Sequence, residues 1–311
     1  MSVPCLLCGG ATTLVLGDVR DTRFGAPGSW SIRACPACGL EQTDPLPSAP
    51  ELKALYETYY NFPKLRAQDA GASAYASRRE RFYMSPLYRL VLWVDGDISF
   101  YGERGTGRLL DVGCNEGRGL PIYRRNGFTV EGMELNAHAA AIARAKGFTV
   151  HEALLDGFQP AMPYDRVVLS NVLEHALDPR GMLKDIHRVL RPGGEVWISL
   201  PNSRSWLRRA LGRRWINWHV PYHITHFASD RLRRLLEETG YRIVEERHVT
   251  PALWVAQSAI AALFPNRPDM LRKTALVAGL MLLARGVLFP VLWLGNLAGR
   301  GDCLAIKAQR V

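Results

Sequence analysis

Short apolar runs alternate with amphipathic segments through residues 107–249 of the chain. Each run has the length of a strand, and three of them end at glycine, asparagine or proline. A further apolar run closes the chain. The pattern predicts strands at Arg108–Gly113, Thr129–Leu135, Phe148–Ala153, Asp165–Asn171, 195–201, 241–249 and Asp302–Gln309.

The segments between these strands carry helix start and stop signals. Asn136 is an N-cap residue before an alanine-rich segment that ends at Gly147. Asp178-Pro179 opens a segment with one apolar face. Strands that alternate with helices form a parallel sheet covered on both faces. The sequence therefore predicts an α/β fold with a mostly parallel, seven-stranded sheet.

The flanking regions break this alternation and divide the chain into three parts. Residues 1–45 hold two pairs of cysteines among glycines and prolines, which indicates a small zinc-ribbon-like module. Residues 46–106 are predicted to be a helical linker or lid, because Ser48-Ala-Pro-Glu51 is a capping box before an apolar face. Residues 107–311 form the α/β domain, with an apolar helical insert at residues 250–300 before the last strand.

The apolar insert consists of two stretches, Pro251–Phe264 and Thr274–Gly299. The second has the roughly 20 residues that span a bilayer, but Arg285 and Pro290 interrupt it. A span would also separate the last strand from its sheet. An interfacial or re-entrant helical hairpin is therefore favoured over a span. Two buried helices in an enlarged core, or a dimer interface, are the alternatives.

The charge of the chain favours an acidic partner. Its 311 residues carry a formal net charge of +10, which suits nucleic acid, an anionic membrane surface or a phosphorylated substrate. Residues 203–215 mix five arginines with Trp206 and Trp215, as anionic lipid interfaces and phosphate sites require. A solvated basic helix is the alternative. No basic segment followed by an apolar run opens the chain, so we expect a cytoplasmic protein, peripheral at the inner face of the membrane.

The loop after the strand at 108–113 is rich in glycine. It contains Asp111, Gly113, Asn115 and Gly117, and Glu134 ends the next strand, roughly 20 residues on. Glycine lets the backbone approach a ligand closely, and an acid at that distance can bind ribose hydroxyls. The spacing does not meet the dinucleotide pattern GxGxxG. An ordinary tight strand-to-helix turn is the alternative.

Several segments resemble the class I, Rossmann-like methyltransferases that use S-adenosylmethionine. They are LLDVGCNEGRG, GMELN, DRVVLSNVLEHALDP and HRVLRPGGEVWISLPN, all within residues 107–249. The first resembles the family motif DxGCGxG, with Asn115 where the family usually has glycine. Asparagine tolerates left-handed backbone geometry, so we expect the turn to survive.

The resemblance implies S-adenosylmethionine as the cofactor. It implies that cofactor-binding residues lie in the glycine-rich loop and after the next three strands: Asp111, Gly113, Asn115, Gly117, Glu134, Ala153, Leu154 and Asn171. Glu134 would take the ribose hydroxyls, while Ala153 and Leu154 would lie near the adenine. Asn171 would lie near the sulfonium and its amino acid tail.

Methyl transfer to a hydroxyl or an acidic carbon is helped by a general base, and histidine suits this role near neutral pH. Three histidines cluster within residues 218–227, and His175 follows the strand that ends at 171. Both segments fall at the carboxyl end of the sheet. We expect His223 to be the base, with His219 and His175 as further candidates. Histidines that only hold the loop, or an enzyme without a base, are the alternatives.

The paired cysteines have the spacing of two zinc knuckles, Cys5-x-x-Cys8 and Cys35-x-x-Cys38. Four thiolates form a closed tetrahedral site, which is structural. Incidental thiols or a disulfide pair are the alternative. The module and Asn115 resemble bacterial sugar C-methyltransferases, in which such a module helps form the substrate cleft. The apolar tail resembles methyltransferases of surface-polysaccharide pathways, whose substrates can be lipid-linked.

These observations together predict methyl transfer from S-adenosylmethionine to a small-molecule or glycan acceptor. This acceptor can be lipid-linked. Residues 250–300 and 203–215 are the expected contacts with a membrane surface. An RNA methyltransferase is the second hypothesis, but the basic residues lie beside an apolar insert and no RNA-binding module is recognised. A cofactor-binding scaffold without catalysis is the third.

Overall fold

The computed structural model describes residues 3–59, 82–83, 85–265 and 267–311. Its larger sheet has the strand order β10-β11-β8-β7-β4-β5-β6. All pairs among β8, β7, β4, β5 and β6 are parallel, whereas β11 is antiparallel to both of its neighbours. The strands are β4 (Arg108–Val112), β5 (Thr129–Met133), β6 (Thr149–His151), β7 (Tyr164–Ser170), β8 (Leu190–Pro201), β10 (Tyr241–Val249) and β11 (Cys303–Arg310). The predicted mostly parallel, seven-stranded sheet is confirmed.

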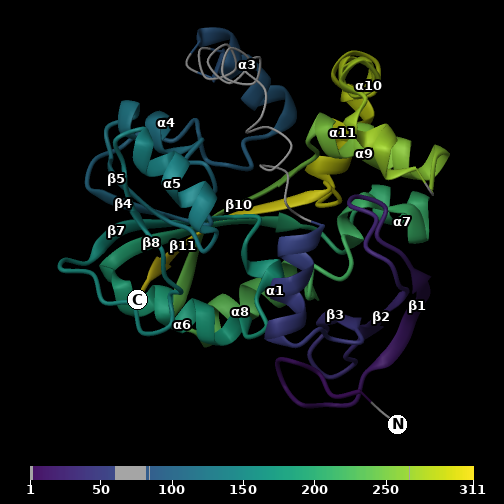
Figure 1. Ribbon diagram of the computed structural model, residues 1–311, viewed down its shortest axis with the longest axis horizontal. Coiled ribbons are helices and arrows are strands. Elements are labelled where there is room, and N and C mark those ends of the chain that lie inside the picture. Colours follow the sequence, from purple (N-terminus) through teal and green to yellow (C-terminus); the bar gives the residue numbers. More distant parts are fainter. Residues whose placement is uncertain (1–2, 60–81, 84, 266) are drawn as a thin grey trace.

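Helices cover both faces of this sheet (Figure 1). α4 (Leu120–Arg125) and α5 (Ala137–Ala145) lie on one face, and α6 (Pro179–Val189) and α8 (Ser229–Glu238) lie on the other. The predicted caps are present, since the side chains of Asn136 and Asp178 accept hydrogen bonds from the first turns of α5 and α6. Side chains from both helix layers bury the sheet between them.

Two strand boundaries differ from the sequence prediction. The strand predicted at 195–201 begins earlier, because Leu190 already pairs with Tyr164 before a register shift, so Pro192-Gly193-Gly194 lies inside β8. A residue at positive φ, such as Gly193 at 70°, is what such an irregularity requires. The strand predicted at Phe148–Ala153 is shorter, with only Thr149–His151 paired to β5. Ala153 and Leu154 therefore lie in the loop beyond the edge strand.

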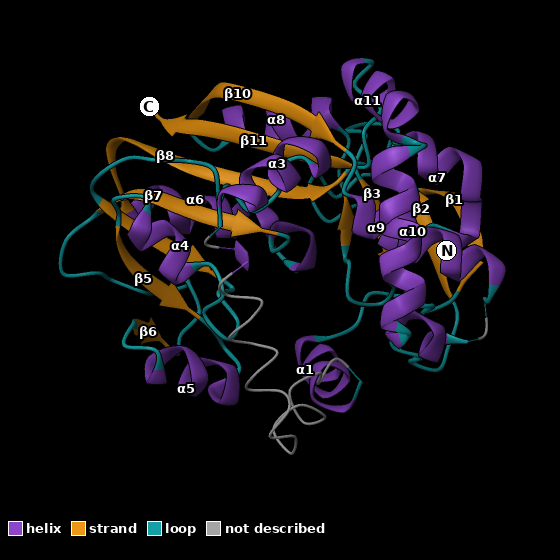
Figure 2. Ribbon diagram, turned by 90° about the horizontal axis from the view of Figure 1, so that it is seen from above, coloured by secondary structure: helices purple, strands orange, loops and turns teal. Residues whose placement is uncertain are grey.

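A second, four-stranded sheet joins the N-terminal segment to the middle of the chain (Figure 2). Three of its strands come from the N-terminal segment, and the fourth is β9 (Thr225–His226), which pairs with β3 through Glu41 and Gln42. The N-terminal strands are β1 (Thr13–Val19), β2 (Trp30–Ala34) and β3 (Glu41–Asp44). Cys5, Cys35, Cys38 and Leu40 belong to the same buried cluster as the strands and helices of the large sheet. Residues 1–45 thus pack into the main core.

The region predicted as a helical linker contributes two helices to the described part of the chain. α1 (Ala49–Thr58) starts with the predicted capping box, in which the Ser48 hydroxyl accepts from the Glu51 backbone and the Glu51 carboxylate accepts from the Ser48 backbone. α3 is Pro86–Asp95. The part of this prediction that covers residues 60–81 and 84 lies outside the described residues.

The apolar insert forms three α-helices and the short 3-10 helix η5 (Pro268–Arg272) between β10 and β11: α9 (Ala252–Leu263), α10 (Thr274–Gly286) and α11 (Phe289–Leu297). α9 is largely buried, but α10 and α11 bury only Ala284 and Gly295. The predicted interruption is present. Pro290 cannot continue a helix from Gly286, and the two helices meet at 66°. Within the described chain no single helix has the length and apolar character to cross a membrane, although α10 and α11 taken together meet those two criteria.

The segment between β8 and β9 is a chain of short helices: α7 (Trp206–Leu211) and the 3-10 helices η3 (Gly212–Arg214) and η4 (Ile216–Trp218). Asp302, directly before β11, connects this segment to the large sheet by hydrogen bonds. Its buried carboxylate accepts hydrogen bonds from Trp215 Nε1 and Asn217 Nδ2, each at 2.8 Å.

Replacement of Asp302 by alanine should lower the free energy of unfolding by about 2–4 kcal/mol, because two buried donors lose their acceptor. Urea unfolding followed by circular dichroism measures this value. Glu237→Ala, an exposed carboxylate on α8, is the matched control and should leave the midpoint unchanged. Equal midpoints for both variants would show that Asp302 does not hold the segment.

Candidate functional site

The strand order places a switch point at β4, because the chain runs from β4 outward to β5 and β6 and then returns to β7 on the other side of β4. In open α/β sheets ligands bind beyond the carboxyl ends of the strands at such a point. Three predicted site residues lie there. Asp111 is in β4, Glu134 directly follows β5, and Asn171 directly follows β7.

The glycine-rich loop crosses from β4 toward β5. The backbone amides of Gly113 and Cys114 both donate to Met133 O, at 2.8 and 3.1 Å. Gly113, Asn115 and Gly117 all have positive φ, so the asparagine adopts the left-handed geometry expected of it. A Cβ on Gly113 would come within 2.9 Å of Val172 Cγ2, and one on Gly117 within 2.8 Å of Ala143 Cβ. Close packing therefore requires glycine at both positions.

Glu134 connects this loop to α5. One carboxylate oxygen accepts from the backbone amide of Asn115 and the other from that of Asn136, both at 2.8 Å. A carboxylate has about four lone-pair sites, so each oxygen keeps acceptor capacity for a further hydroxyl. The side chain is only half-buried and can meet a ligand.

Asp111 is a second acidic residue at this end of the sheet, close to Glu134. Its side chain is buried, and burial, aided by the nearby charge of Glu134, raises its pKa to about 7. Two acids with no cation between them favour a positively charged ligand. S-adenosylmethionine carries a sulfonium, an ammonium and two ribose hydroxyls, so this pair of acids and the glycine loop fit it.

The remaining predicted cofactor residues surround the same edge. Asn171 has φ of 56°, and its amide donates to Ser199 O at 2.8 Å, so the chain turns sharply as β7 ends. Ala153 and Leu154 follow β6, the edge strand, and Leu154 is 61% exposed. The structure thus brings the predicted loop, Glu134 and Asn171 to one edge, with the adenine candidates at its outer end.

A buried group of histidines lies directly after the Asn171 turn. The 3-10 helix η2 (Leu173–His175) carries Glu174 and His175, and Ile224 N donates to Glu174 O at 2.8 Å. This bond brings the segment with His219 and His223 against η2. One polar atom from each of Glu174, His175 and His223 lies within 4.8 Å of the others. The three predicted histidines are therefore together.

Hydrogen bonds fix the ring of His223. Its Nδ1 lies 2.8 Å from Asn217 O, and a carbonyl can only accept, so the proton is on Nδ1 and the unprotonated Nε2 accepts from His219 Nδ1. Nε2 lies 3.1 Å from His219 Nδ1 and 3.9 Å from Glu174 Oε1. The Nδ1 of His175 is protonated for the same reason, since it lies 3.0 Å from Tyr222 O.

Burial keeps the ionisable groups of this cluster neutral. Desolvation lowers the pKa of His175 to about 4 and holds the pKa values of His219 and His223 well below the usual imidazole value. The Arg23 charge and the neighbouring imidazoles lower them further. Desolvation also raises the pKa of Glu174 to about 8. Neither carboxyl oxygen of Glu174 has a hydrogen-bond partner among the described residues.

The N-terminal segment builds one wall of this cluster. Thr43 in β3 donates its hydroxyl to His223 O at 2.6 Å and contacts His226 Nε2 at 3.1 Å. The hydroxyl of Tyr56 in α1 lies 2.8 Å from His175 Nδ1, and the Phe24 ring packs on His219 with centroids 5.2 Å apart. His226 itself lies in β9.

Three of these residues were missed by sequence reasoning. Glu174 sits beside His175 in the sequence, but only the fold shows that its carboxyl group is buried without a partner. Tyr56 belongs to the apolar face predicted for α1, which gave no signal of a polar contact. Thr43 lies in β3, a short strand that pairs with β9 from a distant part of the chain.

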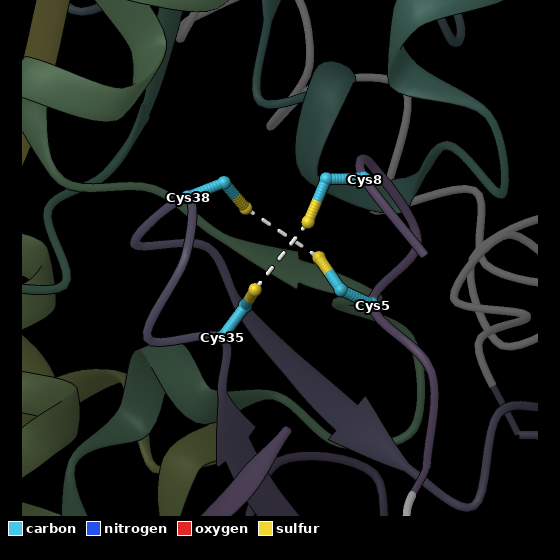
Figure 3. Close-up of side chains that lie close together, drawn as sticks. All are labelled: Cys5, Cys8, Cys35 and Cys38. Atoms are coloured by element: carbon cyan, nitrogen blue, oxygen red, sulfur yellow. Dashed lines mark hydrogen bonds between the residues drawn. The ribbon is translucent and has the colours of Figure 1, made fainter. Parts of the chain in front are cut away.

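The four paired cysteines converge on one point (Figure 3). Cys5 Sγ lies 3.5 Å from Cys38 Sγ, and Cys8 Sγ lies 3.4 Å from Cys35 Sγ. A tetrahedral zinc ion with bonds of about 2.3 Å separates its sulfurs by about 3.8 Å, so the four thiols fit such an ion closely. All six cysteines of the chain have free thiols in the structure.

The arginine-rich segment is divided between two environments. Arg208 is largely covered, since it pairs with Glu41 at 3.0 Å and lies over the Trp218 ring, and Trp215 is buried. These two residues therefore hold the fold and are not part of the exposed basic surface that the sequence suggested. The arginines that remain exposed are Arg204, Arg209, Arg213 and Arg214.

Comparisons with known proteins show the family of the chain. A family model described as a methyltransferase domain matches residues 75–246. The ubiquinone biosynthesis O-methyltransferase of Cronobacter sakazakii is 31% identical over 171 residues, which are 49% of this chain and 69% of the relative. The enzyme of the same name from Pectobacterium atrosepticum is 31% identical over 182 residues, 53% and 73% of the two chains.

Among solved structures, the cyclase SpnF superposes with a TM-score of 0.50 at 18% identity, covering 85% of this chain and 97% of its own. That similarity shows the shared fold alone. The family match covers more than half of the chain and includes the glycine-rich loop, Glu134 and the histidine cluster. The chain therefore belongs to the methyltransferase-domain family and is an S-adenosylmethionine-dependent methyltransferase.

Proposed function

We propose that the chain methylates a hydroxyl group of a small-molecule or glycan acceptor, which can be lipid-linked, and that a buried histidine takes the proton of that hydroxyl. The observation that carries this proposal is the cluster of Glu174, His175, His219 and His223 directly beside the cofactor edge. Val172 packs on Gly113, so the cluster starts within a few residues of the glycine-rich loop. The relatives named above are O-methyltransferases, which supports an oxygen acceptor.

The bound cofactor supplies a methyl group on a sulfonium, which a nucleophile can displace directly. The residues of this chain must then align the acceptor oxygen, exclude water and remove its proton. His223 is our first choice as base, because its Nε2 lone pair is free of a proton. His219 and His175 are the further candidates.

Replacement of His223 by asparagine should lower kcat by about 10²–10⁴-fold, the usual contribution of a general base. S-adenosylmethionine affinity should stay the same. The assay is release of S-adenosylhomocysteine with phenolic, nucleotide-linked and lipid-linked sugar acceptors. His187→Asn is the matched control, since His187 lies at the end of α6, away from the carboxyl edge.

The pH profile provides a second readout of the same prediction. The pKa values of His175, at about 4, and of His223, well below its usual value, leave both rings unprotonated at neutral pH. At saturating S-adenosylmethionine, which removes the effect of Asp111 on cofactor binding, kcat should show no acid limb from these imidazoles as pH drops from about 8 to about 6, since the base form persists until the pH reaches the lowered pKa. An acid limb near 6.5 that disappears in His223→Asn would contradict the buried, neutral base.

We also propose that Glu134 binds the ribose hydroxyls. Glu134→Ala should weaken S-adenosylmethionine binding by about 1–3 kcal/mol, the scale of hydrogen bonds to a charged group. Calorimetry measures this, with Glu134→Gln expected to lose less because it keeps one acceptor oxygen. Glu237→Ala on α8 should bind as the wild type does. Unchanged affinity in Glu134→Ala would remove the ribose assignment.

The four cysteines, we propose, hold a structural zinc ion that stabilises β3 and, through β9, the histidine segment. The purified chain should contain one zinc ion by mass spectrometry, and Cys8→Ser/Cys35→Ser should lose it. Because the histidines would be displaced, kcat should fall about 10–100-fold while cofactor affinity changes little. Cys303→Ala, a buried thiol in β11, should keep its zinc. A metal-free wild type, or unaltered kcat in the double variant, would count against this role.

A further inference from the structure

The outer side of α10 and α11 is the largest accumulation of exposed apolar side chains in the described chain. Leu282 and Val287 are 68% and 69% exposed, and Leu294 and Leu297 are 55% and 66% exposed. Single exposed apolar residues are common on protein surfaces, but a contiguous group of this size marks an interaction site. The alternative of two helices buried in an enlarged core does not hold for α10 and α11.

The inner side of the same helices is already occupied. Ala284 packs with Ala252 and Val255 of α9, and Leu207 of α7 joins this cluster. Trp206 of α7 lies against Gly295 of α11, where a Cβ would come within 3.0 Å of the indole. α10 and α11 thus rest on α7 and α9 with a defined outer face.

Basic residues outnumber acidic ones around this face, and the exposed Asp269 of η5 is already paired with Arg267. No aspartate or glutamate occurs between Asp269 and Asp302. Arg285 is the only charged residue within 274–297, and its guanidinium is paired with the Asp95 carboxylate of α3, Nε to Oδ1 at 2.8 Å. Exposed cations flank the apolar stretch at both ends: Arg272, Lys273 and Arg300.

Helix α3 extends the apolar face. The Trp93 ring packs near Phe289 of α11, with centroids 5.7 Å apart, and its own exposed fraction is 69%. Leu87 and Leu90 are exposed on the same helix at a spacing of about one turn. α3 and α10 project on the same side of the molecule, beyond both sheets (Figures 1 and 2).

We propose that this face, formed by the outer sides of α10 and α11 and extended by α3, docks on an anionic lipid bilayer. Apolar side chains enter the interfacial region while the flanking cations meet acidic headgroups. A second copy of the chain fits this face less well, because a two-fold contact would bring its basic rims together, and the acid beside them, Asp269, is already paired with Arg267. The proposal goes beyond the methyl-transfer chemistry and rests on different residues.

The test is co-sedimentation of the full chain with vesicles of phosphatidylcholine alone and with phosphatidylglycerol added. The wild type should bind the anionic vesicles and lose binding at high salt. Leu282→Asp/Val287→Asp should bind at least about tenfold more weakly, since charge enters the apolar zone. Leu14→Asp makes the same change at an exposed leucine of β1 and should bind as the wild type does. S-adenosylmethionine affinity, unchanged in all three proteins, reports that they are folded.

Equal sedimentation of all variants, or no sedimentation with either vesicle, would overturn the proposal. So would a wild-type dimer in analytical ultracentrifugation that becomes monomeric in Leu282→Asp/Val287→Asp without any vesicle binding, because a second copy would then cover the face. Vesicle binding without turnover of any acceptor would count against the proposed function and leave the membrane face standing.

Discussion

The pairing of β3 with β9 is the contact on which the candidate site depends. It joins residues 41–42 to residues 225–226 and places the Thr43 hydroxyl on the backbone of His223. The cysteine cluster lies in the same core as the large sheet, so the N-terminal segment and the methyltransferase fold are one packed body. The side of the site proposed for the acceptor is therefore built by two distant parts of the sequence, whereas the side proposed for the cofactor comes from consecutive strand ends.

The two sides of the site also differ in electrostatics. At the cofactor edge Asp111 and Glu134 concentrate negative charge, which suits a cationic ligand. In the histidine cluster burial suppresses charge on both acid and base. A cation is drawn to the neighbouring edge. The fold thus places the acids that attract a cationic ligand and the histidines proposed to take the proton in two separate places. Only a few residues of β7 and η2 lie between them.

Local signals were sufficient for the sheet and the cofactor loop. Strand periodicity, caps at Asn136 and Asp178, and the glycine-rich loop all act within a few residues, and each predicted feature is present. β9 escaped prediction because a two-residue strand has no periodicity and its partner is far along the chain. Apolar composition also could not separate buried α9 from exposed α10, since burial is decided by tertiary packing and both helices are apolar on most sides.

The late position of β9 has a consequence for biosynthesis. All four clustered cysteines lie within residues 1–38, but the strand that pairs with β3 follows roughly 180 residues after β3. A ribosome that adds about 5–20 residues per second needs about 10–40 s to synthesise that stretch. During that interval β3 is an open sheet edge, the kind of surface that recruits other strands. The N-terminal segment therefore emerges long before β9 completes its sheet, and β3 is open to mispairing in that interval.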